Sequence, residues 1–193
     1  MTDDPATGAR AWLNEVAAVD EAVYAAVAEV PTPRLDRAMR RLSTAANYSR
    51  IWLAEALVLS AAGGPRGRRA AATGLASIAL SSAAVNLVAK PLAGRARPNR
   101  ASRRGGAVPT EPQVRMPRSR SFPSGHAASA VAFASGASRV LPQASVPLHT
   151  MAALVAYSRV HTGVHYPADV IAGAVIGSAC ADIVTSAVAG HRR

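Results

Sequence analysis

The longest uncharged stretch of the chain runs over residues 70–89, where twenty consecutive positions carry no acidic or basic side chain. Twenty residues of helix are long enough to cross a hydrocarbon core of ~30 Å. A segment in that core must satisfy its backbone polar groups internally, and an isolated segment does so as a helix. The fold is therefore expected to include at least one membrane-spanning helix.

Further apolar segments are shorter, and two of them contain an acid: 51–62 with Glu55, 126–138, 144–158, and 170–190 with Asp182. The chain is 50% hydrophobic but only 4% aromatic, so its helices are expected to pack through small side chains. We predict an all-α, integral-membrane bundle of about five transmembrane helices. A mean hydropathy of +0.13 is low for such a protein, which leaves a soluble helical bundle as the alternative.

The N-terminal region shows helical periodicity on both sides of a break at residues 31–33. Apolar residues before the break recur every three or four positions: Trp12, Val16, Val19, Val23, Val27 and Val30. After it, apolar residues alternate with arginines, as in a basic helix on a membrane surface. We expect residues 1–49 to form amphipathic interfacial helices and residues 50–193 to form the membrane-embedded core. The alternative is an ordinary pair of core-packing helices.

The net charge of +11 is concentrated in residues 90–122. The cations there are Lys90, Arg95, Arg97, Arg100, Arg103, Arg104, Arg115, Arg118 and Arg120, against the single acid Glu111. Interspersed Pro, Gly and Ser predict a long flexible loop, and the absence of stacking aromatics argues against a nucleic-acid partner. The expected partners are a lipid phosphate and a bilayer containing anionic lipids.

Lys90 and Arg97 form the first of three segments suited to phosphate chemistry. Phosphoryl transfer requires positioning and positive charge around the phosphoryl oxygens, which lysine and arginine supply. Lys90 is the only lysine among 22 basic residues, so this position favours a slim ammonium. The alternative is a lysine that snorkels at a helix end.

The second segment is Pro123-Ser124-Gly125-His126, which precedes an apolar run. Ser124 stands where a helix N-cap is expected, and the free N–H groups of a first turn attract anions. Gly125 leaves room for close approach, and His126 can protonate a leaving oxygen. Taken alone, the segment also fits a turn with an incidental histidine.

The third segment joins Ser158-Arg159 to His165 and Asp169. Pro167 favours a helix start, so His165 and Asp169, four residues apart, are expected to meet on one helical face. A carboxylate that accepts one ring N–H leaves the other nitrogen free to attack, which predicts His165 as nucleophile. His161, His165 and Asp169 also repeat at a spacing typical of zinc ligands. Because nearby cations would repel a metal ion, we expect no metal or other cofactor, and we expect His161 to be structural.

Together the segments resemble the type 2 phosphatidic acid phosphatase superfamily in order and spacing, over residues 90–169. The resemblance implies that Lys90, Arg97, Ser124, Gly125 and Arg159 bind phosphate, that His126 is the general acid, and that His165 forms a phosphohistidine supported by Asp169. It also implies an enzyme that works without a metal and that vanadate inhibits.

The short, Ala- and Arg-rich chain further resembles small actinobacterial members of this family, which dephosphorylate decaprenylphosphoryl-5-phosphoribose for cell-wall arabinan synthesis. Polyprenyl diphosphate, phosphatidylglycerophosphate and phosphatidic acid are the other candidate substrates. A non-catalytic protein that binds anionic lipid is an alternative of another class. Five spans would bring all three segments to one face of a plasma membrane crossed several times, and the positive charge favours the cytoplasmic face.

Overall fold

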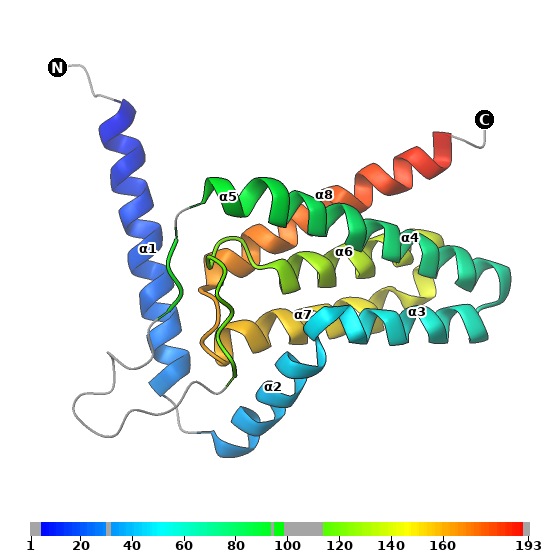
Figure 1. Cartoon of the computed structure of the whole chain (residues 1–193), viewed down its shortest axis with the longest axis horizontal. Helices are drawn as coiled ribbons and strands as arrows, with labels where there is room; N and C mark the ends of the chain where they lie inside the picture. Colours follow the sequence, from blue (N-terminus) through cyan, green and yellow to red (C-terminus); the bar gives the residue numbers. More distant parts are fainter. Residues whose placement is uncertain (1–4, 30–31, 94, 99–113, 191–193) are drawn as a thin grey trace.

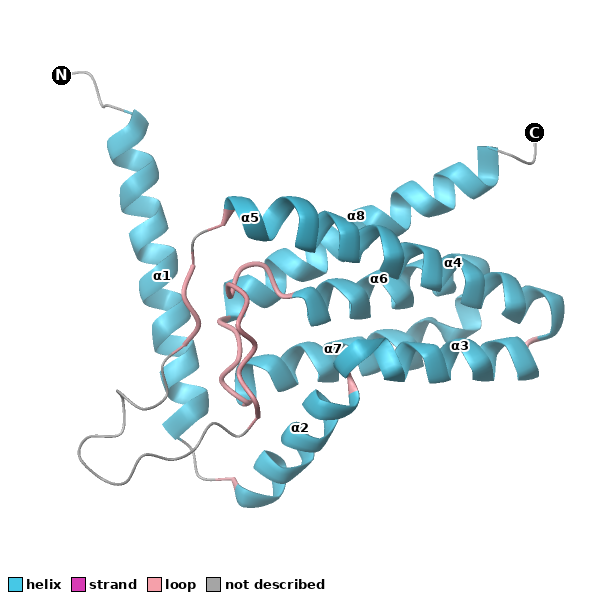
Figure 2. Cartoon of the chain, in the orientation of Figure 1, coloured by secondary structure: helices cyan, strands magenta, loops and turns pink. Residues whose placement is uncertain are grey.

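The computed structural model describes residues 5–29, 32–93, 95–98 and 114–190, and every regular element within these ranges is helical (Figures 1 and 2). The elements are α1 (Pro5–Glu29), α2 (Pro33–Ala45), the 3₁₀ helix η1 (Asn47–Ser49), α3 (Arg50–Ala62), α4 (Gly64–Ala83), the π-helical turn η2 (Ala84–Ala89), α5 (Lys90–Leu92), α6 (Gly125–Val140), the 3₁₀ helix η3 (Pro142–Ala144), α7 (Ser145–His161) and α8 (Pro167–Gly190). The predicted fold class is confirmed.

Helices α3, α4, α6, α7 and α8 run alongside one another as a bundle, and they coincide with the apolar segments of the sequence (Figure 1). The central helix is α6, which packs against α4, α7 and α8. It can be central because its buried side chains are mostly alanines, with Phe133 as the single large one. Phe133 meets Trp52 of α3 at a ring-centroid distance of 5.7 Å.

Small residues bring the bundle helices into backbone contact. A Cβ atom added at Gly177 of α8 would lie 2.3 Å from the carbonyl oxygen of Ala128 in α6. One added at Gly173 would lie 2.4 Å from the carbonyl oxygen of Ser124. The helices can approach this closely only because neither position has a side chain, as at many helix contacts in membranes.

Large apolar side chains are exposed on the outer surface of the bundle, whereas many of its interior contacts are made by small side chains. Leu57, Leu87, Val146 and Ile171 are 64–78% exposed on four different bundle segments. Residues 64–92 and 167–190 are, among the described helices, the two that are long and apolar enough to cross a membrane. Helices α3, α6 and α7 have 13, 16 and 17 residues. The number of crossings therefore stays a prediction.

One N-terminal helix forms on each side of the break predicted at residues 31–33. In Figure 1, α1 runs across the end of the bundle rather than along it. Asp20 and Tyr24 of α1 are buried, whereas Trp12, Val19 and Val23 from its apolar stripe are exposed. Val16 and Val27 of the same stripe are half-buried, so the bundle covers the stripe only in part.

Two of the apolar segments contain an acid, Glu55 in α3 and Asp182 in α8. Asp182 pairs with Arg139 of α6, and both side chains are about half exposed. They lie in the half of the bundle remote from α1, because Arg139 is near the end of α6 and Asp182 is far along α8. Glu55 is half-buried in α3.

The close contact at Gly177 predicts a large effect of a very small substitution. Gly177→Ala would push α8 away from the α6 backbone and should lower the free energy of unfolding by about 1–3 kcal/mol. Thermal unfolding in detergent measures the change. Gly190→Ala is the matched control, because it makes the same substitution in the same helix with nothing within 4 Å. Equal melting temperatures for the two variants would contradict this account of the packing.

Candidate active site

The three sequence segments meet at the end of the bundle that α1 crosses. They are carried by the C-terminal end of the α4–α5 helix, the start of α6, and the turn between α7 and α8. The Ser124 amide donates to the Asp169 carbonyl at 2.9 Å, which joins the second segment directly to the third. The predicted convergence is therefore observed in the arrangement of the backbone.

Ser124 is the N-cap of α6, as predicted. It is fully buried, and its Oγ accepts a hydrogen bond from the Ala127 amide at 3.4 Å. The next residue, Gly125, starts the helix, and a Cβ atom placed there would stand 3.9 Å from Lys90 Nζ. The open N-terminal turn of α6 therefore lies beside the ammonium of Lys90, as an anion site requires.

Lys90 and His126 line one pocket of about 200 Å³. Lys90 is at the end of the 64–92 helix, and its Nζ donates to Asn86 Oδ1 at 3.3 Å. His126 Nε2 lies 3.0 Å from Asn47 Oδ1 in η1. Since that amide oxygen can only accept, Nε2 carries the proton, so this nitrogen is a donor.

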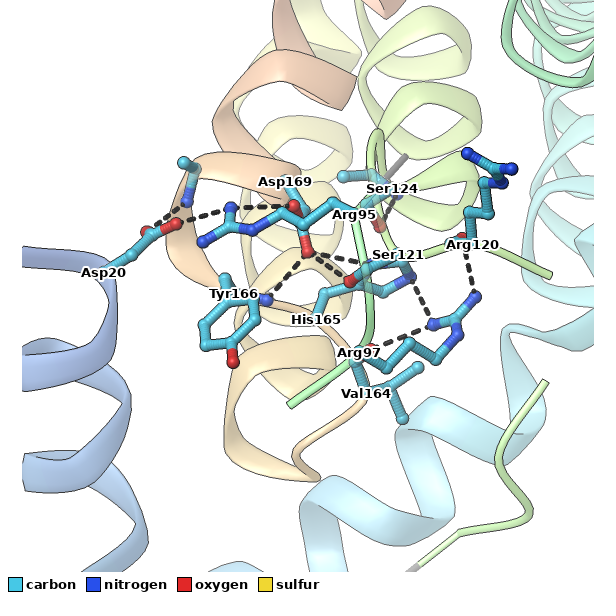
Figure 3. A network of polar contacts seen from close by, with 12 residues as sticks. Asp20, Arg95, Arg97, Arg120, Ser121, Ser124, Val164, His165, Tyr166 and Asp169 are labelled. Atoms are coloured by element: carbon cyan, nitrogen blue, oxygen red, sulfur yellow. Dashed lines mark hydrogen bonds and ion pairs between the residues drawn. The ribbon is translucent and has the colours of Figure 1, made fainter. Parts of the chain in front are cut away.

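His165 and Asp169 lie close together, but not on one helical face. Helix α8 begins at Pro167, so His165 precedes it in the turn, and the expectation of a shared helical face is wrong. The turn bends back because the His165 amide donates to the Arg159 carbonyl at 3.1 Å. His165 Nδ1 then lies 3.5 Å from Asp169 Oδ2, a long contact that still directs this nitrogen towards the carboxylate (Figure 3).

Asp169 is fully buried, and several donors surround its carboxylate (Figure 3). Oδ2 accepts the Ser121 hydroxyl at 2.5 Å and the Tyr166 amide at 3.0 Å. Oδ1 accepts from Arg95 Nη1 at 3.1 Å, and the same Nη1 is 2.7 Å from Asp20 Oδ2 of α1. These contacts hold Asp169 ionised although its side chain is out of contact with bulk water.

Arg97 lies against the other ring nitrogen of His165. Its Nη1 is 3.3 Å from His165 Nε2 and donates to the Val164 carbonyl at 2.9 Å. The rest of the guanidinium is fixed by Ser119 and by the Arg120 carbonyl. An arginine only donates hydrogen bonds, so Nε2 is the acceptor and the ring proton is on Nδ1.

The environment keeps His165 neutral. Burial lowers its pKa to about 4, and this outweighs the hydrogen bond with Asp169, which raises the pKa. The nearby charge of Arg97 also favours the neutral imidazole. Burial lowers the pKa of Arg97 as well. A neutral ring with its lone pair on Nε2 is the form of histidine that can act as a nucleophile.

Arg159 and His161 are both buried at the end of α7, and both contact α2. Arg159 Nη1 donates to Ser43 Oγ at 2.5 Å. His161 Nε2 lies 2.7 Å from Asp36 Oδ1. His161 is thus held by an acid of α2, as suits a structural residue. The described residues contain no group of three His, Cys, Asp or Glu side chains placed to share a metal ion.

Most partners of the site residues were not predicted from the sequence. They are Asp20, Asp36, Ser43, Asn47, Arg95 and Ser121. Arg95 and Ser121 are close in sequence to the predicted segments, and this closeness could have identified them as partners of the site. The four N-terminal partners had no such signal in the sequence, because their role depends on how α1 and α2 dock against the bundle. Arg100, Arg103 and Arg104 of the predicted basic loop lie outside the described residues.

Comparison with known proteins agrees with this architecture. The model of the PAP2 superfamily matches residues 71–193, whereas comparison with curated protein sequences gave no significant match. Two solved structures are similar in fold. A transmembrane PAP2 type phosphatidylglycerolphosphate phosphatase from Bacillus subtilis has a TM-score of 0.68 at 24% identity, covering 90% of this chain and 86% of its own. Aquifex aeolicus LpxE has a TM-score of 0.65 at 23% identity, covering 85% and 93%.

The family match covers more than half of the chain and contains all three segments, and the fold is that of a transmembrane member of the family. The protein therefore belongs to the PAP2 superfamily and is an enzyme of the phosphatase class.

Proposed function

We propose that the protein removes a phosphate group from a membrane lipid through a phosphohistidine intermediate, without a metal. The observation that carries this proposal is the setting of His165. Its Nδ1 is directed at the buried Asp169 carboxylate, and its Nε2 lone pair points towards Arg97. One nitrogen is thus oriented, and the other is unprotonated, so it can attack phosphorus once a bound phosphate accepts the Arg97 hydrogen bond in its place.

In the first step, His165 Nε2 attacks phosphorus, and the bond to the leaving oxygen breaks. His126, in its imidazolium form, gives its Nε2 proton to that oxygen and becomes a neutral ring, and Asp169 stabilises the imidazolium character that develops on His165. In the second step, His126 accepts a proton from water as the water oxygen attacks phosphorus. The P–N bond breaks, inorganic phosphate leaves, and His165 regains its lone pair.

Lys90, Arg97, Arg159 and the α6 N-terminus at Ser124 and Gly125 would bind the phosphate oxygens. Lys90 Nζ is beside Gly125, and Arg97 is beside His165, so positive charge borders the site on two sides. Charge on the phosphoryl oxygens in the transition state is stabilised best by donors that are already fixed. The backbone carbonyls that hold Arg97 fix it in advance.

We propose that the bundle crosses the plasma membrane several times, with the site at its cytoplasmic surface. Residues 1–49 would lie at the interface with anionic lipids, and residues 50–193 would form the embedded core. The exposed stripe of Trp12, Val19 and Val23 supports an interfacial α1, since an apolar helix face left uncovered by protein can enter the headgroup region.

Our proposed substrate is decaprenylphosphoryl-5-phosphoribose, a cell-wall arabinan precursor, with polyprenyl diphosphate and phosphatidylglycerophosphate as alternatives. The Bacillus subtilis neighbour is a phosphatidylglycerolphosphate phosphatase, which supports a lipid phosphate. Phosphate release from each of these lipids and from phosphatidic acid, measured side by side, distinguishes the candidates.

His165→Ala should abolish turnover because it removes the attacking nitrogen, and we expect phosphate release to fall by at least about 10³-fold. His149→Ala is the matched control, since His149 is an exposed histidine of α7 near its opposite end. Retention of a tenth of the activity in His165→Ala would exclude this mechanism. Loss of wild-type activity with a chelator, and its return with zinc, would favour a metal site at His161, His165 and Asp169 instead.

Asp169→Asn should slow catalysis more than it weakens binding. The amide cannot fix the Nδ1–H tautomer or stabilise an imidazolium as a carboxylate does, so kcat should fall by about 10²- to 10⁴-fold. KM should change little, because Asp169 is not among the phosphate ligands. Steady-state kinetics separates the two effects, and an unchanged kcat would remove Asp169 from the mechanism.

The pKa of His165 gives a prediction for titration. Because burial lowers it to about 4, the ring should stay neutral as the pH falls through 6.5, the usual value for histidine, and should take up a proton only near pH 4. The ¹⁵N shifts of labelled histidine report this, with the His165 signals assigned from their loss in His165→Asn. A midpoint at 6.5 or above would contradict the described environment.

A further inference from the structure

A second cavity, which we call the arginine pocket, lies beside the proposed catalytic residues. Its volume is about 650 Å³, and five arginines line it: Arg40, Arg41, Arg50, Arg115 and Arg159. We propose that the arginine pocket binds a second phosphate group of the same lipid substrate, so that lipids with two phosphate groups are preferred to lipids with one. This inference rests on the proposed phosphatase function and narrows its substrate class.

The charge of the pocket is unbalanced. Among the described residues that line it, none is acidic. Two arginines outside the pocket have acidic partners: Arg95 pairs with Asp20 and Asp169, and Arg139 pairs with Asp182. Within the described ranges, the structure shows no ion pair for any of the five pocket arginines. Positive charges gathered without counter-charges repel one another, and an anion bound between them relieves that repulsion.

Arg159 also indicates that a ligand is missing from this pocket. Its side chain is 3% exposed, and its Nη1 donates to Ser43. Its Nε is buried and has no hydrogen-bond partner. A buried N–H of a cation without an acceptor is costly. Because Arg159 is also a proposed ligand of the phosphate that is removed, an oxygen of either phosphate group of the substrate would supply the acceptor.

The position of the pocket identifies which part of the substrate it would contact. Asn47 lines the arginine pocket and also holds Nε2 of His126, the proposed proton donor to the leaving oxygen. The arginine pocket therefore lies on the leaving-group side of the reaction. The group it binds would remain on the lipid after hydrolysis, as either a phosphodiester or the inner phosphate of a diphosphate.

Polar and basic side chains of α2 and η1 form one wall of the arginine pocket. Arg40, Ser43, Thr44 and Asn47 recur at helical spacing and line the pocket together. Arg34 and Arg37 belong to the same helix and are exposed, as Arg40 and Arg41 are, but they do not line the pocket. The helix thus provides both the proposed subsite and a matched control of equal charge.

The test compares phosphatidylglycerophosphate, which has a phosphodiester and a terminal phosphate, with phosphatidic acid of the same acyl chains, in micelles of an uncharged detergent. The ratio of their kcat/KM values should be about tenfold or more in the wild type. Arg40→Ala/Arg41→Ala should bring this ratio towards one, while Arg34→Ala/Arg37→Ala should preserve it. Thermal unfolding confirms that both double variants are folded.

The outcomes separate the two proposals. If the wild type releases phosphate from neither lipid nor from the other candidate lipids, the proposed function fails. If it releases phosphate from both lipids with no preference, or with a preference that survives Arg40→Ala/Arg41→Ala, only the second subsite is wrong. A further measurement adds phosphatidylglycerol to the micelles. If Arg40→Ala/Arg41→Ala then lowers kcat/KM equally for both substrates, and does so only when phosphatidylglycerol is present, the pocket binds a separate anionic lipid and this inference is overturned.

Discussion

The buried carboxylate of Asp169 is the constraint on which the site depends. A charge removed from water must be met by donors, and here they come from the loop at Ser121, the turn at Tyr166 and the guanidinium of Arg95. Arg95 in turn binds Asp20 of α1, and Asp20 Oδ1 accepts from the Ala168 amide at 2.7 Å. Satisfying one carboxylate thus ties α1, the loop and the start of α8 together, and the same carboxylate orients His165.

The small side chains of the bundle make this arrangement possible. Gly173 allows the backbone of α8 to approach the carbonyl of Ser124, one residue from the start of α6. Only at that separation can the Ser124 amide reach the Asp169 carbonyl, and so the proposed anion site at the start of α6 is fixed relative to Asp169, the carboxylate beside the proposed nucleophile. Close helix packing and catalytic geometry are therefore consequences of the same residue choices.

The chemistry was readable from the sequence, but much of its support was not. Lys90, Ser124, His165 and Asp169 stood out because phosphate chemistry restricts which residue types can serve, and the apolar segments fixed the helices. Contacts such as His126 with Asn47, 79 residues apart, or Arg159 with Ser43, 116 residues apart, depend on how α2 docks. No local pattern encodes that docking. The pair of Asp182 and Arg139, 43 residues apart, likewise depends on how α6 and α8 pack and has no local signal.

The central claim is that His165 takes up phosphorus covalently, and rapid acid-free quenching of turnover with ³²P-labelled lipid tests it most directly. We expect a base-stable, acid-labile label on the peptide that contains His165, attached at Nε2, which water then removes as inorganic phosphate at the rate of turnover. Turnover with no labelled protein at any time, or with the label on another residue, would contradict the account.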